Sequence, residues 1–276
     1  MKKRYFIVVV AAAIFFVGVA VFNHIAKIEP VPWEGYPVAH AMGGIDGYTY
    51  TNSLEAFEFN YGLGQRVFEV DMQLTADNRL VCSHDWEYSS VWCDNIPTEE
   101  EFLSTAVYGQ YTALSIEDLL KLMQQYSDIY IVTDTKYSDP GTVTEQFKLI
   151  TAAAADHAAE PVLDRIVVQI YNDDMLEAVR AVYGFPYIIY TLYQVWDGSP
   201  ESFGHYLEFC DDNGISHITM WDYCASPEIL TMAGNYGIHI LVHTVNDLEE
   251  ARELIGLGVE NIYTDYITPD QLLEIS

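Results

Sequence analysis

Basic residues are scarce in this sequence. Lysine and arginine together number 12 among 276 residues, against 41 aspartates and glutamates, so the formal net charge is −29 at pH 7. Four of the basic residues and one acidic residue lie in the first 30 positions, which leaves about −32 for the rest of the chain. A field of this sign repels nucleic acid and anionic lipid surfaces, so neither is an expected partner of this part of the chain. A phosphate-bearing ligand must be held by a metal ion or by a few local cations.

Cysteine is also scarce. The four thiols, Cys82, Cys93, Cys210 and Cys224, lack the spacing of a zinc site. A disulfide between Cys82 and Cys93 would pin the short aromatic segment between them as a loop. In the fold predicted below, Cys210 and Cys224 lie at opposite ends of the domain, too far apart to form a disulfide.

One long hydrophobic run is present, at residues 5–22. It carries no charge and is at the lower limit for a membrane-spanning helix, and the basic residues at positions 2–4 favour a cytoplasmic N-terminus. We predict an uncleaved transmembrane signal anchor over residues 1–22 and a tether over 23–35, which together place the remaining domain outside the cytoplasm. The alternative is a cleaved signal peptide, with small residues at Gly18 and Ala20 near the cut, and this predicts a secreted protein.

Residues 36–276 are predicted to form one domain in which strands and helices alternate. Short apolar, β-branched or aromatic runs predict eight strands, at residues 36–41, 66–73, 128–135, 165–170, 186–192, 214–220, 238–245 and 260–265. Helical periodicity and capping signals, among them Asn52 and Ser115 as N-caps, predict helices at residues 52–63, 115–125, 142–157, 173–183, 200–212, 227–235 and 247–257. Eight parallel strands joined by helices close into a TIM (β/α)8 barrel, and an open doubly wound sheet is the alternative. The interval 85–114 is long for a βα loop, and we expect it to cover the barrel mouth.

Two carboxylates stand within the second predicted strand. Side chains alternate between the faces of a strand, so Glu69 and Asp71 share one face and the apolar residues at 68, 70 and 72 share the other. In a barrel the apolar row packs against helices, and the acidic row points into the lumen near the C-terminal mouth, where barrel enzymes build their sites. By the same alternation, Asp134 and Lys136 share a face at the end of the third strand.

Three carboxylates brought together need a counter-charge. Without a cation, Glu69, Asp71 and Asp134 would force one another to protonate. Ligands that are all oxygen suit Ca²⁺ or Mg²⁺ rather than zinc, so these residues predict a site for one divalent cation. The alternative is a solvated rim of carboxylates with Lys136 as its counter-ion.

Two histidines are predicted at the same mouth. His40 ends the first strand and His84 follows the second, and imidazoles that titrate near neutrality can give and take protons within one turnover. We predict that this pair is catalytic. Residues at the ends of other strands are expected to bind the substrate, namely Lys136, Gln169, Trp221 and His243.

Several segments resemble one known family. "VAHAMGG", "TNSLEAF", "FEVDMQLTADNRLVCSHD", "TDTK", "VHTVND" and "ENIYTDY" occur in this order between Val38 and Asp265, and they are similar to segments of glycerophosphodiester phosphodiesterases. The third segment is the most specific of them. The resemblance implies a TIM barrel, of the superfamily of phospholipase C-like phosphodiesterases, that binds one divalent cation and hydrolyses a phosphodiester.

The resemblance also assigns roles to residues. It implies that His40 and His84 are the catalytic histidines and that Glu69 and Asp71 are metal ligands, with Lys136 near the phosphate. Asp134 stands where the family usually has a glutamate ligand, so the cation is expected to shift or to bind this side chain through water.

Two further positions depart from the family pattern. Ala41 stands where the family has arginine, and Thr51 stands where it has glutamate. Loss of an arginine removes a bidentate phosphate clamp. We expect backbone N–H groups of the glycines at 43, 44 and 47, or a reshaped first loop, to assist in its place.

The predicted function is metal-dependent hydrolysis of glycerophosphodiesters or related phospholipid head-group diesters, small-molecule or lipid-derived. A substrate hydroxyl attacks phosphorus while one histidine accepts its proton and the other protonates the leaving oxygen. A barrel glycosidase is less favoured, because Glu69 and Asp71 come from one strand rather than from opposite sides of a sugar. An inactive phosphate-binding barrel at the cell surface is the other alternative.

Overall fold

The computed structural model describes residues 33–87, 92 and 95–275. No helix within these residues is both long and apolar enough to cross a bilayer. The predicted anchor over 1–22 lies outside the described residues, as does most of the tether, so both stay predictions. Residues 35–276 form one structural unit, and the fold below is that of this unit.

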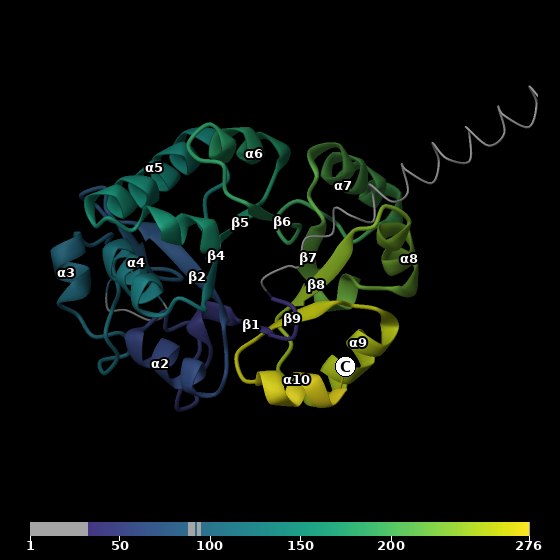
Figure 1. The fold of residues 1–276 in the computed structure, drawn as a ribbon, viewed down its shortest axis with the longest axis horizontal. Helices are drawn as coiled ribbons and strands as arrows, with labels where there is room; N and C mark the ends of the chain where they lie inside the picture. The colour runs from purple at the N-terminus through teal and green to yellow at the C-terminus, as the bar shows by residue number, and fades with distance from the viewer. Residues whose placement is uncertain (1–32, 88–91, 93–94, 276) are drawn as a thin grey trace, which may run out of the picture. The chain divides into compact units, whose positions relative to one another are not determined.

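Eight parallel strands form a closed barrel. They run in the order β1-β9-β8-β7-β6-β5-β4-β2, and β1 also pairs with β2, which closes the ring (Figure 1). At the closure, Val38 lies opposite both Val67 of β2 and Tyr263 of β9. The barrel strands are β1 (Val38–Ala39), β2 (Val67–Leu74), β4 (Tyr130–Asp134), β5 (Ile166–Ile170), β6 (Tyr187–Thr191), β7 (His217–Trp221), β8 (His239–His243) and β9 (Asn261–Thr264). All eight predicted strands and the predicted TIM barrel are confirmed, and the open sheet is excluded.

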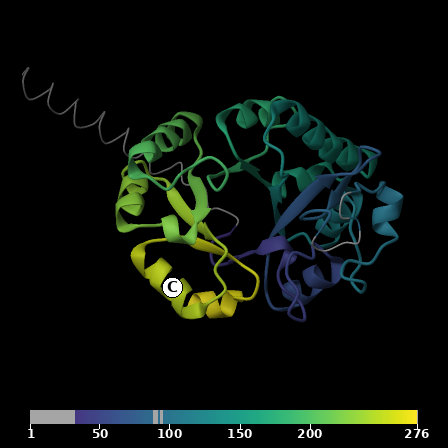
Figure 2. The ribbon, with the colours of Figure 1, turned by 180° about the vertical axis from the view of Figure 1, so that it is seen from behind.

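Helices surround the strands in both views of the barrel (Figures 1 and 2). They are α2 (Leu54–Gly62), α3 (Glu99–Leu103), α4 (Ile116–Gln125), α5 (Pro140–Asp156), α6 (Asp173–Arg180), α7 (Pro200–Asn213), α8 (Pro227–Asn235), α9 (Leu248–Leu257) and α10 (Pro269–Ile275), with short 3-10 turns η1 (His40–Met42), η2 (Glu160–Arg165) and η3 (Asp222–Cys224). Ser115 caps α4 through a capping box with Asp118. Gly214 and Gly258, both in the left-handed conformation that favours glycine, end α7 and α9. The seven predicted helices are confirmed.

Some local details differ from the prediction. The N-cap of α2 is Ser53 rather than Asn52, because Asn52 turns inward and binds the backbone N–H and side chain of Asp71. Glu55 accepts hydrogen bonds from Thr112 instead of closing a capping box. The short strand β3 (Leu80–Cys82), antiparallel to β2, and the helices α3 and α10 have no counterpart among the predicted elements.

The two faces of the strands fill two different cores. The predicted alternation in β2 is confirmed, because Phe68, Val70 and Met72 belong to the buried cluster between strands and helices. Other apolar strand residues are equally buried but lie outside that cluster, on the lumen face: Val67, Val132, Val167, Ile189 and Leu241. These side chains fill the lower barrel.

Within the described residues, the interval 85–114 packs beside the barrel. The prediction that it covers the barrel mouth also concerns residues 88–91 and 93–94, which lie outside the described residues. Phe102, Val107 and Tyr111 are buried in the core between strands and helices. Within the described residues, none of this interval lines the cavity at the barrel mouth.

Cys210 and Cys224 are free, as predicted, and Cys82 is a free buried thiol; Cys93 lies outside the described residues.

A partly exposed ion-pair cluster joins β7, β8 and the residue before β9 at the end of the barrel opposite the mouth. Glu260 accepts a hydrogen bond from Nε2 of His217 at 3.1 Å and another from Nδ1 of His239. Burial by itself raises the pKa of the Glu260 carboxyl, but these two imidazole contacts outweigh it and hold that pKa well below its usual range.

Glu260→Gln is expected to lower the free energy of unfolding at pH 7 by about 1–3 kcal/mol, because a charged hydrogen-bond acceptor is lost. A carboxyl with a lowered folded-state pKa contributes stability above its unfolded pKa, about 4.3, and loses it as pH falls toward the folded value. The difference between variant and wild type should therefore shrink at pH 3.5. Urea unfolding at pH 7 and pH 3.5 measures this difference in the free energy of unfolding, and Glu228→Gln, at an exposed position, is the control. An equal difference at the two pH values would contradict the lowered pKa of Glu260.

Candidate active site

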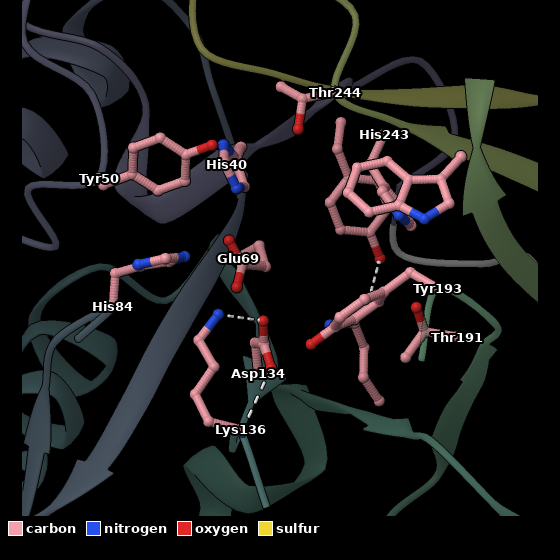
Figure 3. Close-up of a pocket in the computed structure, with 13 residues that line it drawn as sticks. His40, Tyr50, Glu69, His84, Asp134, Lys136, Thr191, Tyr193, His243 and Thr244 are labelled. Atoms are coloured by element: carbon pink, nitrogen blue, oxygen red, sulfur yellow. Dashed lines mark hydrogen bonds and ion pairs between the residues drawn. The ribbon is translucent and has the colours of Figure 1, made fainter. Parts of the chain in front are cut away.

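One cavity of about 290 Å³ opens among the carboxyl ends of the barrel strands. Each strand or its following loop contributes to its wall, as Figure 3 shows for the labelled residues. The lining residues are His40, Tyr50, Glu69, His84, Asp134, Lys136, Gln169, Thr191, Tyr193, Trp221, His243, Thr244 and Tyr263. Every predicted site residue lines this cavity except Asp71, which forms an ion pair with Lys136.

Three carboxylates converge at one side of the cavity. Asp71 and Asp134 lie opposite each other in the register of β2 and β4, and Glu69 precedes Asp71 by two residues on the same face. One oxygen from each of the three lies within 4.8 Å of the others. The Lys136 ammonium lies between Asp71 and Asp134, 2.6 Å from an oxygen of Asp134. A positive charge therefore already sits against two of the three carboxylates.

Neighbouring groups fix the orientation of each carboxylate. The backbone N–H of Ala41 donates to Glu69 Oε2 at 2.7 Å. The Asn52 amide donates to Asp71 at 2.7 Å, and the Tyr171 hydroxyl donates to Asp134. Glu69 Oε1 has no hydrogen-bond partner among the described residues although it is buried. The carboxylates are thus held in place, and one buried oxygen still lacks a partner.

The protonation of this cluster reflects crowding of like charges. Burial, and then the negative charge of Asp71, raises the pKa of Glu69 to about 8. Burial alone would raise the pKa of Asp71 as well, but the Lys136 ammonium outweighs it and holds that pKa below its usual value. Three ionised carboxylates in this space need more positive charge than one lysine supplies. The donor set, all oxygen and acidic, fits a hard divalent cation such as Ca²⁺ or Mg²⁺.

Two histidines face the cavity, each held by a carboxylate. His40 Nδ1 donates to Asp265 at 2.9 Å, and His84 Nδ1 donates to Asp85 at 2.7 Å. Each bond leaves Nε2 as the nitrogen for a substrate. Burial would lower the pKa of His40, but the bond to Asp265 and the charge of Glu69 outweigh it and raise that pKa to about 9.

The ring of Tyr50 lies between the two histidines. Its centroid is 4.8 Å from that of His40 and 4.6 Å from that of His84 (Figure 3). Tyr50 has a positive φ of 58°, as do Ala41 and Asn52 at 48° and 46°. The loop after β1 thus takes several left-handed turns, which bring His40, Tyr50 and Asn52 to one side of the cavity.

The backbone of this loop does not supply the phosphate contacts expected from its glycines. The N–H of Gly43 donates to the carbonyl of His40, and that of Gly44 donates to the carbonyl of Asp265. Gly44 instead allows close packing, because a Cβ there would lie 2.3 Å from the ring of Tyr266. Gly47 does not line the cavity. Lys136 is therefore the one lysine or arginine in the cavity wall formed by the described residues.

The cavity wall across from His40 and His84 is aromatic and neutral. His243 lies against Trp221 and Tyr193, with ring centroids 4.9 and 5.7 Å away. Burial, and then the positive charge of His40, lowers the pKa of His243 to about 3, so its imidazole is uncharged. Tyr263 donates to Gln169 at 2.9 Å across the barrel. This bond closes the floor of the cavity.

The roles of several site residues were absent from the sequence prediction. Asp265 and Asp85 orient the histidines, Asn52 holds Asp71, and Tyr50 and Tyr193 line the cavity. Asp85 directly follows His84, and Asp265 ends the last strand, so their positions in the sequence were a signal for them. Tyr50 had no such signal, because its place depends on the left-handed turns of its loop.

The chain is similar to one known family in sequence and to several solved structures in fold. Residues 43–268 match the model of the glycerophosphoryl diester phosphodiesterase family. A glycerophosphodiester phosphodiesterase from Parabacteroides distasonis has 19% identity and a TM-score of 0.67, over 88% of this chain and 97% of that one. An Oleispira antarctica phosphodiesterase, solved with the product sn-glycerol-3-phosphate, has 17% identity and a TM-score of 0.66, over 87% of this chain and 96% of that one. At these identities the likeness shows the fold. No curated protein matches the chain.

Proposed function

The chain belongs to the glycerophosphoryl diester phosphodiesterase family and is a phosphoric diester hydrolase, and from this we propose that it hydrolyses glycerophosphodiesters with the help of one divalent cation. One observation carries the proposal. Three carboxylates and two carboxylate-bound imidazoles meet around a single cavity. Burying several acidic groups together costs free energy unless a cation or hydrogen bonds compensate for it, as a metal site would.

Glu69, Asp71 and Asp134 are the residues that would hold the cation, which is Ca²⁺ or Mg²⁺. The unpartnered Glu69 Oε1 and the ammonium seated against the two aspartates support this assignment. When bound, such a cation withdraws charge from a phosphate oxygen and makes a nearby hydroxyl more acidic. Asp134 reaches the other two carboxylates despite its short side chain, so it fits the same set.

His40 and His84 divide the two proton transfers between them. One Nε2 accepts the proton of the attacking hydroxyl as its oxygen bonds to phosphorus, and the other gives a proton to the oxygen whose bond to phosphorus breaks. If the attacking hydroxyl belongs to the substrate, a cyclic phosphate forms, and water then opens it with the two roles reversed. Asp265 and Asp85 keep each imidazole in the required tautomer.

Lys136 binds the phosphate and takes over part of the role of the missing arginine. Its side chain is partly buried, and the charges of Asp71 and Asp134 raise its pKa above the usual value against the effect of burial, so it remains a cation. Ala41 leaves no cation at its own position, and its N–H is already bound to Glu69. The proposal therefore places fewer fixed charges on the phosphate than the family pattern has.

An assay of the purified full chain tests this function. Bis-p-nitrophenyl phosphate and a panel of glycerophosphodiesters are incubated with and without a chelator, and Ca²⁺ or Mg²⁺ is then added back. Cleavage that a chelator stops and one of these ions restores supports the proposal. No turnover of any diester, with metal bound, would support the inactive binding barrel instead.

We also propose that the barrel lies outside the cytoplasm. The basic residues at 2–4 and the uncharged run at 5–22 support a membrane anchor with the barrel outside the cytoplasm, or secretion after cleavage. Membrane fractionation followed by N-terminal sequencing tests it. Recovery of the protein in the cytoplasm would contradict both forms.

A further inference from the structure

The cavity has two walls of different chemistry. The carboxylates, His40, His84 and Lys136 lie on one side. Tyr193, Thr191 and His243 lie on the other (Figure 3). A phosphodiester joins two alcohols through one phosphate. When the phosphate lies at the charged wall, one of the two alcohols must lie along the second wall. We call this second wall the neutral wall, and it consists of Gln169, Thr191, Tyr193, Trp221, His243 and Tyr263.

The neutral wall carries no fixed charge. Burial, and then the charge of Asp134, raises the pKa of Tyr193 to about 12, and burial raises the pKa of Tyr263 well above its usual value, so both hydroxyls stay protonated. His243 is uncharged, as described above. A charged alcohol would find no counter-ion on this side of the cavity. The neutral wall therefore suits an uncharged group.

Two buried polar atoms of the neutral wall lack partners. Thr191 lies beside Thr219 in the register of β6 and β7, and the Thr219 hydroxyl bonds to His243 Nδ1 at 2.9 Å. Neither Thr191 Oγ1 nor His243 Nε2 has a hydrogen-bond partner among the described residues. Buried polar atoms normally find partners, so a ligand with hydroxyl groups accounts for them better than an apolar one.

Aromatic rings extend the neutral wall outward. Trp221 is 39% exposed at the cavity entrance, and the 79% exposed Tyr223 lies parallel to it, with centroids 6.2 Å apart and planes 10° apart. Tyr193 stands at 74° to Trp221 on the other side. A flat indole with an upright neighbour offers a platform for a ring with weakly polar C–H faces. A linear three-carbon alcohol would leave most of this platform uncovered.

We propose that the alcohol bound at the neutral wall is an uncharged ring polyol, a cyclitol or a hexose, stacked on Trp221 with hydroxyl groups bound by Thr191 and His243. This inference rests on the proposed phosphodiesterase function and names the substrate class for it. A quaternary ammonium or an acyl chain would leave both buried polar atoms unpaired.

The test compares diesters that share glycerol phosphate and differ in the second alcohol. We expect kcat/KM for glycerophosphoinositol or a glycerophosphohexose to exceed that for glycerophosphocholine and glycerophosphoethanolamine by about tenfold or more. The ratio between the first two substrates identifies which ring is preferred. Equal kcat/KM values for all four would overturn the inference while leaving the phosphodiesterase function in place.

Variants locate the preference in the neutral wall. Trp221→Ala and Thr191→Val should each lower kcat/KM for the ring substrates by about 10–100-fold, a larger loss than for glycerophosphocholine, and Trp221→Phe should recover part of the loss. Tyr236→Ala, an exposed aromatic at the far end of α8, is the control. If Trp221→Ala unfolds at a lower temperature than the control, Trp221→Leu replaces it. A ring preference that survives these changes would overturn the inference, and no turnover of any diester by the wild type would overturn the function as well.

Discussion

Replacing His84 by alanine is expected to lower kcat for a glycerophosphodiester by about 10²–10⁴-fold, the usual contribution of one general acid or base. The His84 side chain is 33% exposed, so its removal leaves no large buried cavity. His205→Ala removes an equally polar but 64% exposed imidazole outside the site and is the matched control. A loss of kcat below tenfold in His84→Ala, with the fold intact, would contradict the two-histidine mechanism.

The leaving group tells the two histidines apart. The p-nitrophenolate ion leaves without a proton, so the histidine that protonates the leaving oxygen matters little for bis-p-nitrophenyl phosphate. His40→Ala and His84→Ala are therefore each assayed on this ester and on a glycerophosphodiester. The variant that loses kcat on both substrates lacks the base, and the variant that loses it mainly on the glycerophosphodiester lacks the acid.

Glu69→Gln is expected to weaken binding of Ca²⁺ or Mg²⁺ by at least about 10–100-fold, a loss that even outer partners of metal ligands cause. The amide keeps an oxygen for the Ala41 N–H, so the loop after β1 stays attached. It removes a buried carboxylate that Asp71 and Asp134 disfavour in its charged form. The variant should consequently be no less stable than the wild type without metal.

Calorimetric titration of each ion measures the affinity directly, without an activity assay. A thermal shift on adding metal provides a second readout, since a ligand at 100 times its Kd stabilises the folded state by about 2.7 kcal/mol. Glu58→Gln, an exposed carboxylate on α2, is the control. Undiminished metal binding in Glu69→Gln would exclude Glu69 from the metal site.

The barrel was predictable because its strands and helices carry their patterns locally. Most strands are short runs rich in β-branched and aromatic residues, and helices such as α4 have an apolar stripe behind a cap, here Ser115. β3 escaped prediction because three residues are too few for a pattern. The burial of the described part of the interval 85–114 escaped prediction because it depends on contacts with α2, such as those between Glu55 and Thr112.

The site was predictable where chemistry and strand alternation coincide. Glu69, Asp71 and Asp134 interrupt apolar strands on their lumen face, and this placement predicted a site at the barrel mouth. The side chains that orient them escaped prediction: Asn52 lies in a loop, and Tyr171 reaches Asp134 from a neighbouring strand end. Such partners depend on distances across the barrel.

By itself, the sequence determined the alternation of strands and helices, the lumen face of β2 and the acidic and imidazole groups of the site, because these follow from residue type and spacing along the chain. Tertiary structure alone decided the pairing of His40 with Asp265, the place of Tyr50 between two histidines, and the neutral wall with its unpartnered Thr191 and His243. Closure of the barrel is the physical reason, since it brings residues more than 200 positions apart to one cavity, and backbone turns with positive φ then set the direction in which each side chain points.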